Sequence, residues 1–63
     1  MKFEYLQVYL NSKVYLAFDG ASHCDGDKSL IILLNRLGQD RWEYCQYVHE
    51  NDVEYHLLKR SLP

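Results

Sequence analysis

The sequence has few of the residues that cross-link or anchor a small protein. It contains two cysteines, Cys24 and Cys45, which could form at most one disulfide, and no apolar segment follows Met1 as in a secretion signal. We therefore expect reduced thiols and a cytoplasmic protein. The longest apolar run, residues 30–34, is far shorter than the roughly 18 to 20 residues that span a bilayer. No membrane partner is expected.

Neither sign of charge dominates. Seven Lys and Arg residues against nine Asp and Glu residues give a net charge of −2, so there is no global basic field to attract a phosphate backbone. General nucleic-acid binding is therefore disfavoured. The 63 residues are 48% hydrophobic without a long polar tract, which predicts a single domain over residues 1–63. Domains this small usually need a disulfide, a metal or a second subunit for stability.

Aromatic and β-branched residues predict a first strand pair at residues 3–10 and 14–18, with a tight turn at Asn11 and Ser12 that places Tyr9 opposite Val14. The side expected to face the core carries Phe3, Tyr5, Tyr9, Val14, Leu16 and Phe18. The reverse side carries Leu6, Val8, Leu10, Tyr15 and Ala17. Because the reverse side is too apolar to be left in water, we expect another subunit to cover it. The predicted oligomer interface is Leu6, Val8, Leu10 and Tyr15.

A second strand pair is predicted at residues 42–50 and 53–61, around a tight turn at Asn51 and Asp52. This register pairs Glu43 with Arg60 and His49 with Glu54, two cross-strand pairs of opposite charge when His49 is protonated. The side expected to face the helix carries Trp42, Tyr44, Val48, Tyr55 and Leu57. The expected outer side carries Glu43, Cys45, Tyr47, His49, Glu54, His56, Leu58 and Arg60.

A loop and one helix separate the two strand pairs. Residues 19–28 hold two Asp-Gly pairs without periodicity and predict a loop, in which Asp25 or Asp27 caps the helix that follows. Leucines at three- and four-residue spacing then predict an amphipathic helix, with Gly38 as the left-handed residue at its end and with Leu37 and Trp42 at the centre of the core. The expected fold is α+β, a four-stranded antiparallel sheet with one helix packed on one face, in the order β-β-α-β-β.

The segment LNRLGQDRWE at residues 34–43, the ending LLKRSLP and the opening FEYLQV together resemble the small bacterial and phage domain-of-unknown-function family 4177. The resemblance implies a fold and assigns no activity. Arg41 departs from the family pattern, which has a glycine before the tryptophan. Either the turn here avoids a positive φ angle, or a cation has been placed beside Trp42.

Metal-binding and catalytic patterns are weak. The residues that could bind a metal are His23, Cys24, Cys45, His49 and His56, but no recognised ligand spacing organises them. A Cys24 nucleophile with His23 as its base would need an orienting group and an oxyanion site, and neither is evident. Asp19, Asp25 and Asp27 lack the spacing of a calcium loop. We therefore expect no catalytic residue, no metal and no cofactor.

Aromatic and cationic residues leave two functions open. Six tyrosines, Trp42 and scattered cations could form a pocket in which a ring stacks and cations hold phosphates, although aromatics in a small sheet usually form the core or an interface. The candidate ligand residues are His23, Lys28, Arg41, Tyr47, His56, Lys59 and Arg60. The first prediction is a non-enzymatic homo-oligomer, for example a phage-type protein that sequesters a small nucleotide-like ligand between subunits. The alternative is a module that docks on a different protein, such as a host protein, through the apolar outer sheet face, and a small enzyme ranks third.

Overall fold

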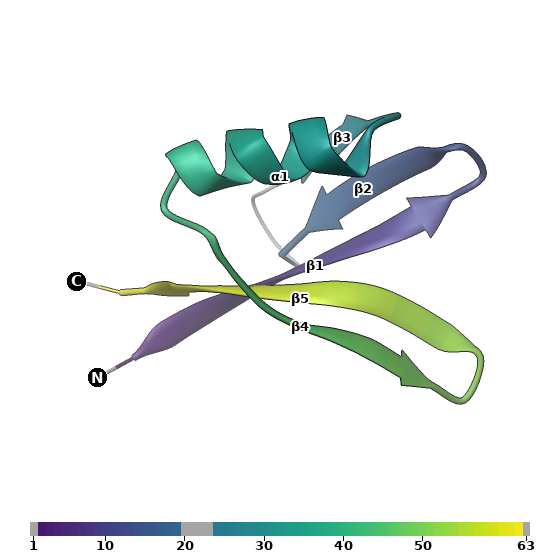
Figure 1. Cartoon of the computed structure of the whole chain (residues 1–63). Coiled ribbons are helices and arrows are strands. Elements are labelled where there is room, and N and C mark those ends of the chain that lie inside the picture. The colour runs from purple at the N-terminus through teal and green to yellow at the C-terminus, as the bar shows by residue number, and fades with distance from the viewer. Residues whose placement is uncertain (1, 20–23, 63) are drawn as a thin grey trace.

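The computed structural model describes residues 2–19 and 24–62, which form one antiparallel sheet and one helix (Figure 1). In chain order the elements are β1 (Phe3–Asn11), β2 (Val14–Phe18), β3 (Cys24–Asp27), α1 (Leu30–Gln39), β4 (Glu43–Glu50) and β5 (Val53–Ser61). The strand order in the sheet is β3-β2-β1-β5-β4. The first and last strands of the chain therefore pair with each other in the middle of the sheet.

The α+β class is confirmed, but the sheet has five strands where four were expected. The extra strand is β3, which lies in the segment predicted to be a loop and pairs with β2 from Tyr15 to Phe18. At Gly26 the two strands approach closely, because a Cβ atom there would come within 2.9 Å of a Leu16 methyl carbon. The Asp-Gly pairs indicated a turn, whereas Gly26 permits this strand to lie against the Leu16 side chain.

The β4–β5 hairpin follows its predicted turn and departs from the predicted register at its far end. Asn51 and Asp52 have φ angles of 49° and 67°, as in a two-residue type I′ turn. His49 pairs with Glu54, as predicted. A register shift between Tyr44 and Gln46 adds one residue to β4, so Glu43 lies opposite Lys59 and the predicted Glu43 to Arg60 pair is wrong.

The β1–β2 hairpin turns one residue later than predicted. Asn11 pairs with Val14, and Ser12 has a positive φ of 59°, so the turn is formed by Ser12 and Lys13. Tyr9 consequently lies opposite Leu16, and the predicted Tyr9 to Val14 pair is wrong. The shift moves each partner by two residues, which leaves the grouping of side chains by face unchanged.

The helix covers the face of the sheet opposite to the predicted one. It lies in front of β2 and β3 in Figure 1. The buried core contains Leu6, Val8, Ala17, Leu33, Leu37, Trp42 and Leu58. The aliphatic side chains of Leu6, Val8 and Leu58, together with the small Ala17, let a helix approach closely. Tyrosines of the other face, such as Tyr5, keep their hydroxyl groups near water.

This choice of face overturns the predicted oligomer interface. Leu6 and Val8 are 1% and 0% exposed within a single chain, and Tyr15 packs partly buried against the same core. Leu10, by contrast, is exposed. Residues that the chain's own helix covers cannot form the centre of a contact with another subunit. The expectation that Leu37 and Trp42 belong to the core is confirmed.

The start of α1 is capped by a serine, where an aspartate was predicted. The Ser29 hydroxyl oxygen accepts from the backbone N–H of Ile32 at 3.3 Å. Asp27 accepts a hydrogen bond from the backbone N–H of Ser29 at 3.0 Å. Asp25 and Asp27 both bind Arg36 of the helix, with nitrogen to oxygen distances of 3.0 and 3.1 Å. Their carboxylates thus tie β3 to α1.

The left-handed residue after the helix is Arg41, with a φ of 72°, while Gly38 lies inside α1. The predicted role of Gly38 is therefore wrong. The backbone N–H of Trp42 donates to the carbonyl oxygen of Leu37 at 3.1 Å, which turns the tryptophan back under the helix end. Arg41 thus adopts the positive φ angle that glycine adopts more easily, at a backbone cost of about 1 kcal/mol relative to glycine.

Two aliphatic residues of α1 test which helix face is the core. Leu33 is 0% exposed and Ile31 is 71% exposed. Leu33→Ala should lower the free energy of unfolding by about 2–5 kcal/mol, because it leaves a cavity in the core. Ile31→Ala should change it by less than about 0.5 kcal/mol. Urea unfolding followed by circular dichroism measures both, and equal effects would contradict the burial described here.

Candidate functional site

A cleft lies where the two hairpins of the sheet diverge. β1 pairs with β5 only from Phe3 to Val8; past that point β1 continues with β2, and β5 continues with β4 (Figure 1). The resulting cleft has a volume of about 800 Å³. It is lined by Gln7, Val8, Tyr9, Leu10, Tyr15, Phe18, Tyr47, Asp52, Val53, Glu54, Tyr55 and His56. The alternation along the strands places these residues on both faces of the sheet, so the cleft opens toward both.

Tyrosines and histidines of the β4–β5 hairpin form a connected cluster along one wall of this cleft. The Tyr44 hydroxyl lies 2.7 Å from Nδ1 of His56, and the Tyr47 ring lies 5.2 Å from the His56 ring. Tyr47 and His49 stack with nearly parallel rings, 6.4 Å apart. Because residues on one face of a strand pair are neighbours, these side chains hold one another in place.

Glu54 joins this cluster through two neighbours. The Tyr47 hydroxyl donates a hydrogen bond to its carboxylate, and Nε2 of His49 lies 3.9 Å from its other oxygen. The hydrogen bond to the Glu54 carboxylate and, to a smaller extent, partial desolvation raise the pKa of the Tyr47 hydroxyl above its ordinary value of 10.0. The Tyr47 hydroxyl therefore stays protonated at neutral pH, and it fixes the position of the Glu54 carboxylate at the cleft.

The charge of the cleft is acidic. Its lining includes the carboxylates of Asp52 and Glu54 and contains no Lys or Arg. A phosphate group placed in the cleft would therefore meet two carboxylates and no permanent cation.

A second, smaller groove of about 450 Å³ lies at the C-terminal end of the helix. Its lining consists of Gly38, Arg41, Trp42, Glu43, Arg60 and Ser61. The Arg60 guanidinium lies 4.2 Å from the centroid of the Trp42 ring, donates to the Asp40 carbonyl oxygen at 2.9 Å and forms an ion pair with Glu4. The cation beside Trp42 is thus Arg60, and its donors already bind groups of this chain.

The sheet face away from the helix is aromatic. Tyr5 and Phe18, both on this face, are 53% and 43% exposed. Other residues that the strand pairing places there are Phe3, Tyr9, Leu16, Tyr55, Leu57 and Lys59. The Lys59 ammonium lies 4.9 Å from the centroid of the Phe3 ring. We call this set of residues the uncovered face, because no helix in the described part of the chain packs on it.

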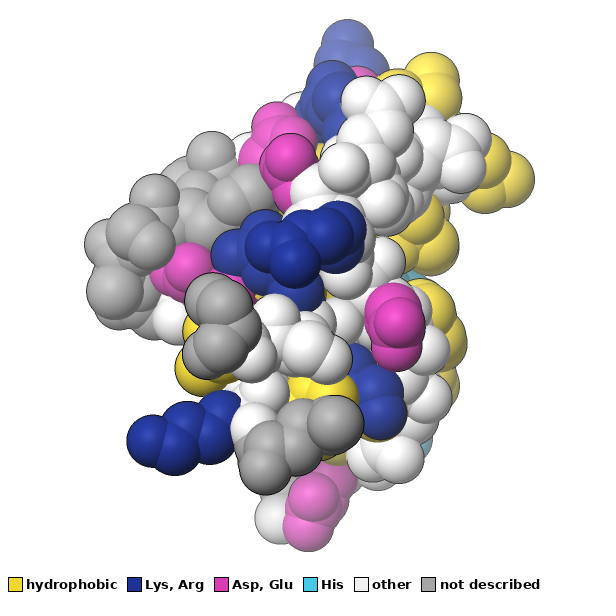
Figure 2. All heavy atoms as spheres, turned by 90° about the vertical axis from the view of Figure 1, so that its left-hand side faces the viewer, with side chains coloured by type: hydrophobic (Ala, Val, Ile, Leu, Met, Phe, Trp, Pro, Cys, Tyr) yellow, Lys and Arg dark blue, Asp and Glu magenta, His cyan; other side chains and the backbone are white. Residues whose placement is uncertain are grey.

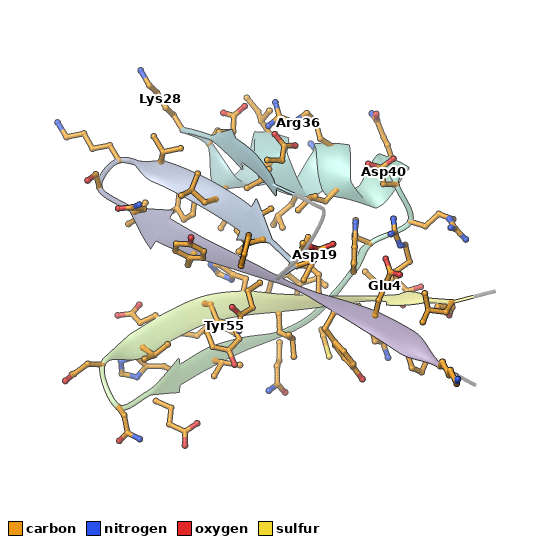
Figure 3. All side chains as sticks on the ribbon, turned by 180° about the vertical axis from the view of Figure 1, so that it is seen from behind. Glu4, Asp19, Lys28, Arg36, Asp40 and Tyr55 are labelled. Atoms are coloured by element: carbon orange, nitrogen blue, oxygen red, sulfur yellow. The ribbon has the colours of Figure 1, made fainter. Side chains whose placement is uncertain are left out.

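The predicted ligand residues do not form one site. Tyr47 and His56 line the cleft, Arg41 and Arg60 line the groove, and Lys59 lies on the uncovered face. Lys28 points outward from the start of the helix in Figure 3, and His23 lies outside the described residues. Figure 2, seen from the side of the helix C-terminus and both chain ends, shows Lys and Arg interleaved with Asp and Glu. A uniform basic patch is not visible from this side.

Sequence reasoning missed the cleft and the acidic residues in it. The predicted opposition of His49 to Glu54 was a usable signal and is confirmed, and the same register places Tyr47 opposite His56. The divergence of the hairpins was not foreseeable, because it depends on where pairing between β1 and β5 stops.

The neighbouring arginines of the groove differ in what they stabilise, and this gives a prediction. Arg60→Ala should lower the free energy of unfolding by about 1–2 kcal/mol, because it removes the contact with Trp42 and the bonds to Glu4 and Asp40. Arg41→Ala should change it by no more than about 0.5 kcal/mol, since Arg41 is exposed. Thermal unfolding of both variants measures this. A larger loss for Arg41→Ala would contradict the assignment.

Comparison with family models, with curated proteins and with solved structures finds no match for this chain. The resemblance to family 4177 stays a prediction. Across residues 2–19 and 24–62, no helix combines the length and the hydropathy that crossing a membrane requires. In the same residues, no three His, Cys, Asp or Glu side chains gather closely enough to hold a metal ion.

Proposed function

We propose that this chain is a non-enzymatic binding protein that works as a homo-oligomer, with two subunits packed against each other through the uncovered face. One observation carries the proposal. The helix lies on one side of a five-stranded sheet, and the opposite side presents aromatic rings such as Tyr5 and Phe18 to solvent. Contiguous apolar surface of this kind on a small protein marks an interaction site.

The size of the face suits a pair of subunits. The two longest dimensions of the subunit are 35 and 26 Å. A sheet side of this size can supply the roughly 800 Å² per partner that specific interfaces bury. Two sheets that pack face to face align their strands within about 30° and interdigitate their side chains. The aromatic residues would then form a second core between the subunits.

The small core of the subunit also favours self-association. Seven side chains are buried in the described part of the chain, and none of them is polar. A domain of this length buries only about 60% of the surface of its unfolded chain, so additional buried apolar area contributes a large share of its stability. A second copy is a simple source of that area, since a symmetric dimer uses the same surface twice.

Two exposed residues of the uncovered face provide a direct test. At micromolar concentration the wild type should sediment as a dimer or larger oligomer, and Tyr5→Asp combined with Phe18→Asp should sediment as a folded monomer. Both side chains are more than two-fifths exposed in the subunit, so the changes should spare the fold. Analytical ultracentrifugation and circular dichroism measure these outcomes.

The matched control carries the same charges on the helix. Ile31→Asp combined with Ile32→Asp changes two residues that are also exposed, on the opposite side of the molecule. It should leave the oligomeric state unchanged. A wild type that sediments as a monomer, or a control that dissociates as readily as the test variant, would contradict self-association through the uncovered face. A monomeric wild type would favour docking on a different protein through the same face.

A nucleotide-like ligand is a second candidate, favoured by the groove in which Arg41 lies close to Trp42. Arg60 in that groove binds Glu4, so Arg41 is the residue whose loss should weaken a phosphate contact without loss of stability. Calorimetric titration with cyclic and linear dinucleotides should give heat for the wild type and at least about tenfold weaker binding for Arg41→Ala. Absence of heat with the wild type would remove this candidate.

A further inference from the structure

We propose that the cleft between the two hairpins binds a small organic cation, an amine or a quaternary ammonium group. The proposal rests on the binding function proposed above and names a ligand class for it. It does not depend on self-association, because the cleft belongs to one subunit.

Charge is the first argument for a cation. The cleft lining contains two carboxylates, Asp52 and Glu54, and no Lys or Arg. The chain as a whole has seven Lys and Arg residues against nine Asp and Glu residues. The cleft is therefore more acidic than the chain as a whole. An ammonium ion gains from these carboxylates, whereas a phosphate or a carboxylate ligand is repelled.

Aromatic rings are the second argument. Four tyrosines line the cleft. Tyr15 from the first hairpin and Tyr47 from the second lie on the sheet side that carries Glu54, and Tyr9 and Tyr55 lie on the other side. Tyr55 lies on β5 just past the segment that pairs with β1 (Figure 3). The negative face of an aromatic ring attracts a cation, and sites for quaternary ammonium groups are built from several such rings.

The position of Glu54 is the third argument. Its carboxylate accepts a hydrogen bond from the Tyr47 hydroxyl, and the Tyr47 ring stacks against His49. The carboxylate thereby lies next to the Tyr47 ring at the cleft wall, so a cation could contact the ring and the carboxylate together. A site held in place before binding loses less conformational entropy when the ligand arrives.

A bare metal ion fits the cleft less well than an organic cation. The described residues contain no group of three His, Cys, Asp or Glu side chains close enough to share one ion. The cleft volume of about 800 Å³ also far exceeds what one ion fills, and lies within the range of pockets for small molecules. Exposed apolar neighbours such as Leu10 and Val53 suit the carbon atoms of an organic cation.

The test compares a cation with its neutral isostere. Titration of the intact ¹⁵N-labelled chain with tetramethylammonium, choline or spermidine should shift the backbone amide signals of the cleft residues in a saturable way. Tert-butanol, which has nearly the shape of tetramethylammonium without its charge, should bind at least about tenfold more weakly, and adenosine monophosphate should leave these signals unchanged.

Matched charge variants locate the binding. Glu54→Gln should weaken tetramethylammonium binding by about three- to tenfold. Glu43→Gln removes the same charge from the separate groove and should leave the affinity unchanged within about twofold. Tyr47→Phe keeps the ring but loses the bond to Glu54, and it should fall between these two variants.

Three outcomes would overturn the proposal: no saturable shifts with any of the three cations, equal binding of tert-butanol, or equal effects of Glu54→Gln and Glu43→Gln. Sedimentation of the same wild-type sample separates this inference from the proposed function. A protein that associates through its uncovered face and binds no amine would leave self-association in place and remove the cation site alone.

Discussion

The rest of this structure depends on one contact, in which the leucine face of the helix packs on aliphatic side chains of the sheet. Leu33 and Leu37 of α1 belong to the same buried cluster as Leu6, Val8 and Leu58 of the two central strands. Because β1 and β5 come from opposite ends of the chain, this contact joins the termini through the core. It also decides which face of the sheet is covered, since one short helix can cover only one.

Charged residues near the helix are used mainly to hold the subunit together. Arg36 binds two aspartates of β3, and Arg60 binds Glu4 of β1 and the carbonyl oxygen of Asp40. Such partly exposed pairs each contribute little, but they fix the edge strand and the C-terminal strand to the helix. Arg60 of the groove is used in this way and the cleft lining contains no Lys or Arg, which is why anionic ligands have weak support here.

The uncovered face and the cleft are two consequences of the same geometry. Strands twist, and β1 and β5 separate where each follows its own hairpin partner. This separation opens the cleft at the margin of the uncovered face. Tyr9 and Tyr55 therefore line the cleft and also belong to the uncovered face. A second subunit on the uncovered face would close the cleft from that side and leave the side toward the helix open.

Local residue patterns were enough to predict the α+β class, the helix, the two hairpins and the membership of Leu37 and Trp42 in the core. These follow from local periodicity and turn chemistry, which act over a few residues. The grouping of residues by strand face was also accessible for β1, β2 and β5, because alternation along a strand has a period of two. In β4 the extra residue places Tyr44 on the side of His56, where the prediction had put it on the opposite side. The pairing of Tyr47 with His56 follows from the same rule.

Which of the two sheet faces the helix covers depends on packing that exists only in the folded chain. Both faces of β1 and β2 are apolar, so composition did not separate them, and the prediction chose the aromatic side. The small Ala17 and the aliphatic side chains of Leu6 and Val8 made the other side the closer fit for a helix. The fifth strand and the extra residue in β4 arise in pairings between strands that are neighbours in the sequence, at positions where turn signals were misleading. The cleft depends on where the pairing of β1 with β5, from opposite ends of the chain, stops. Local sequence carries no record of such pairings, because their energy arises only after the strands have met.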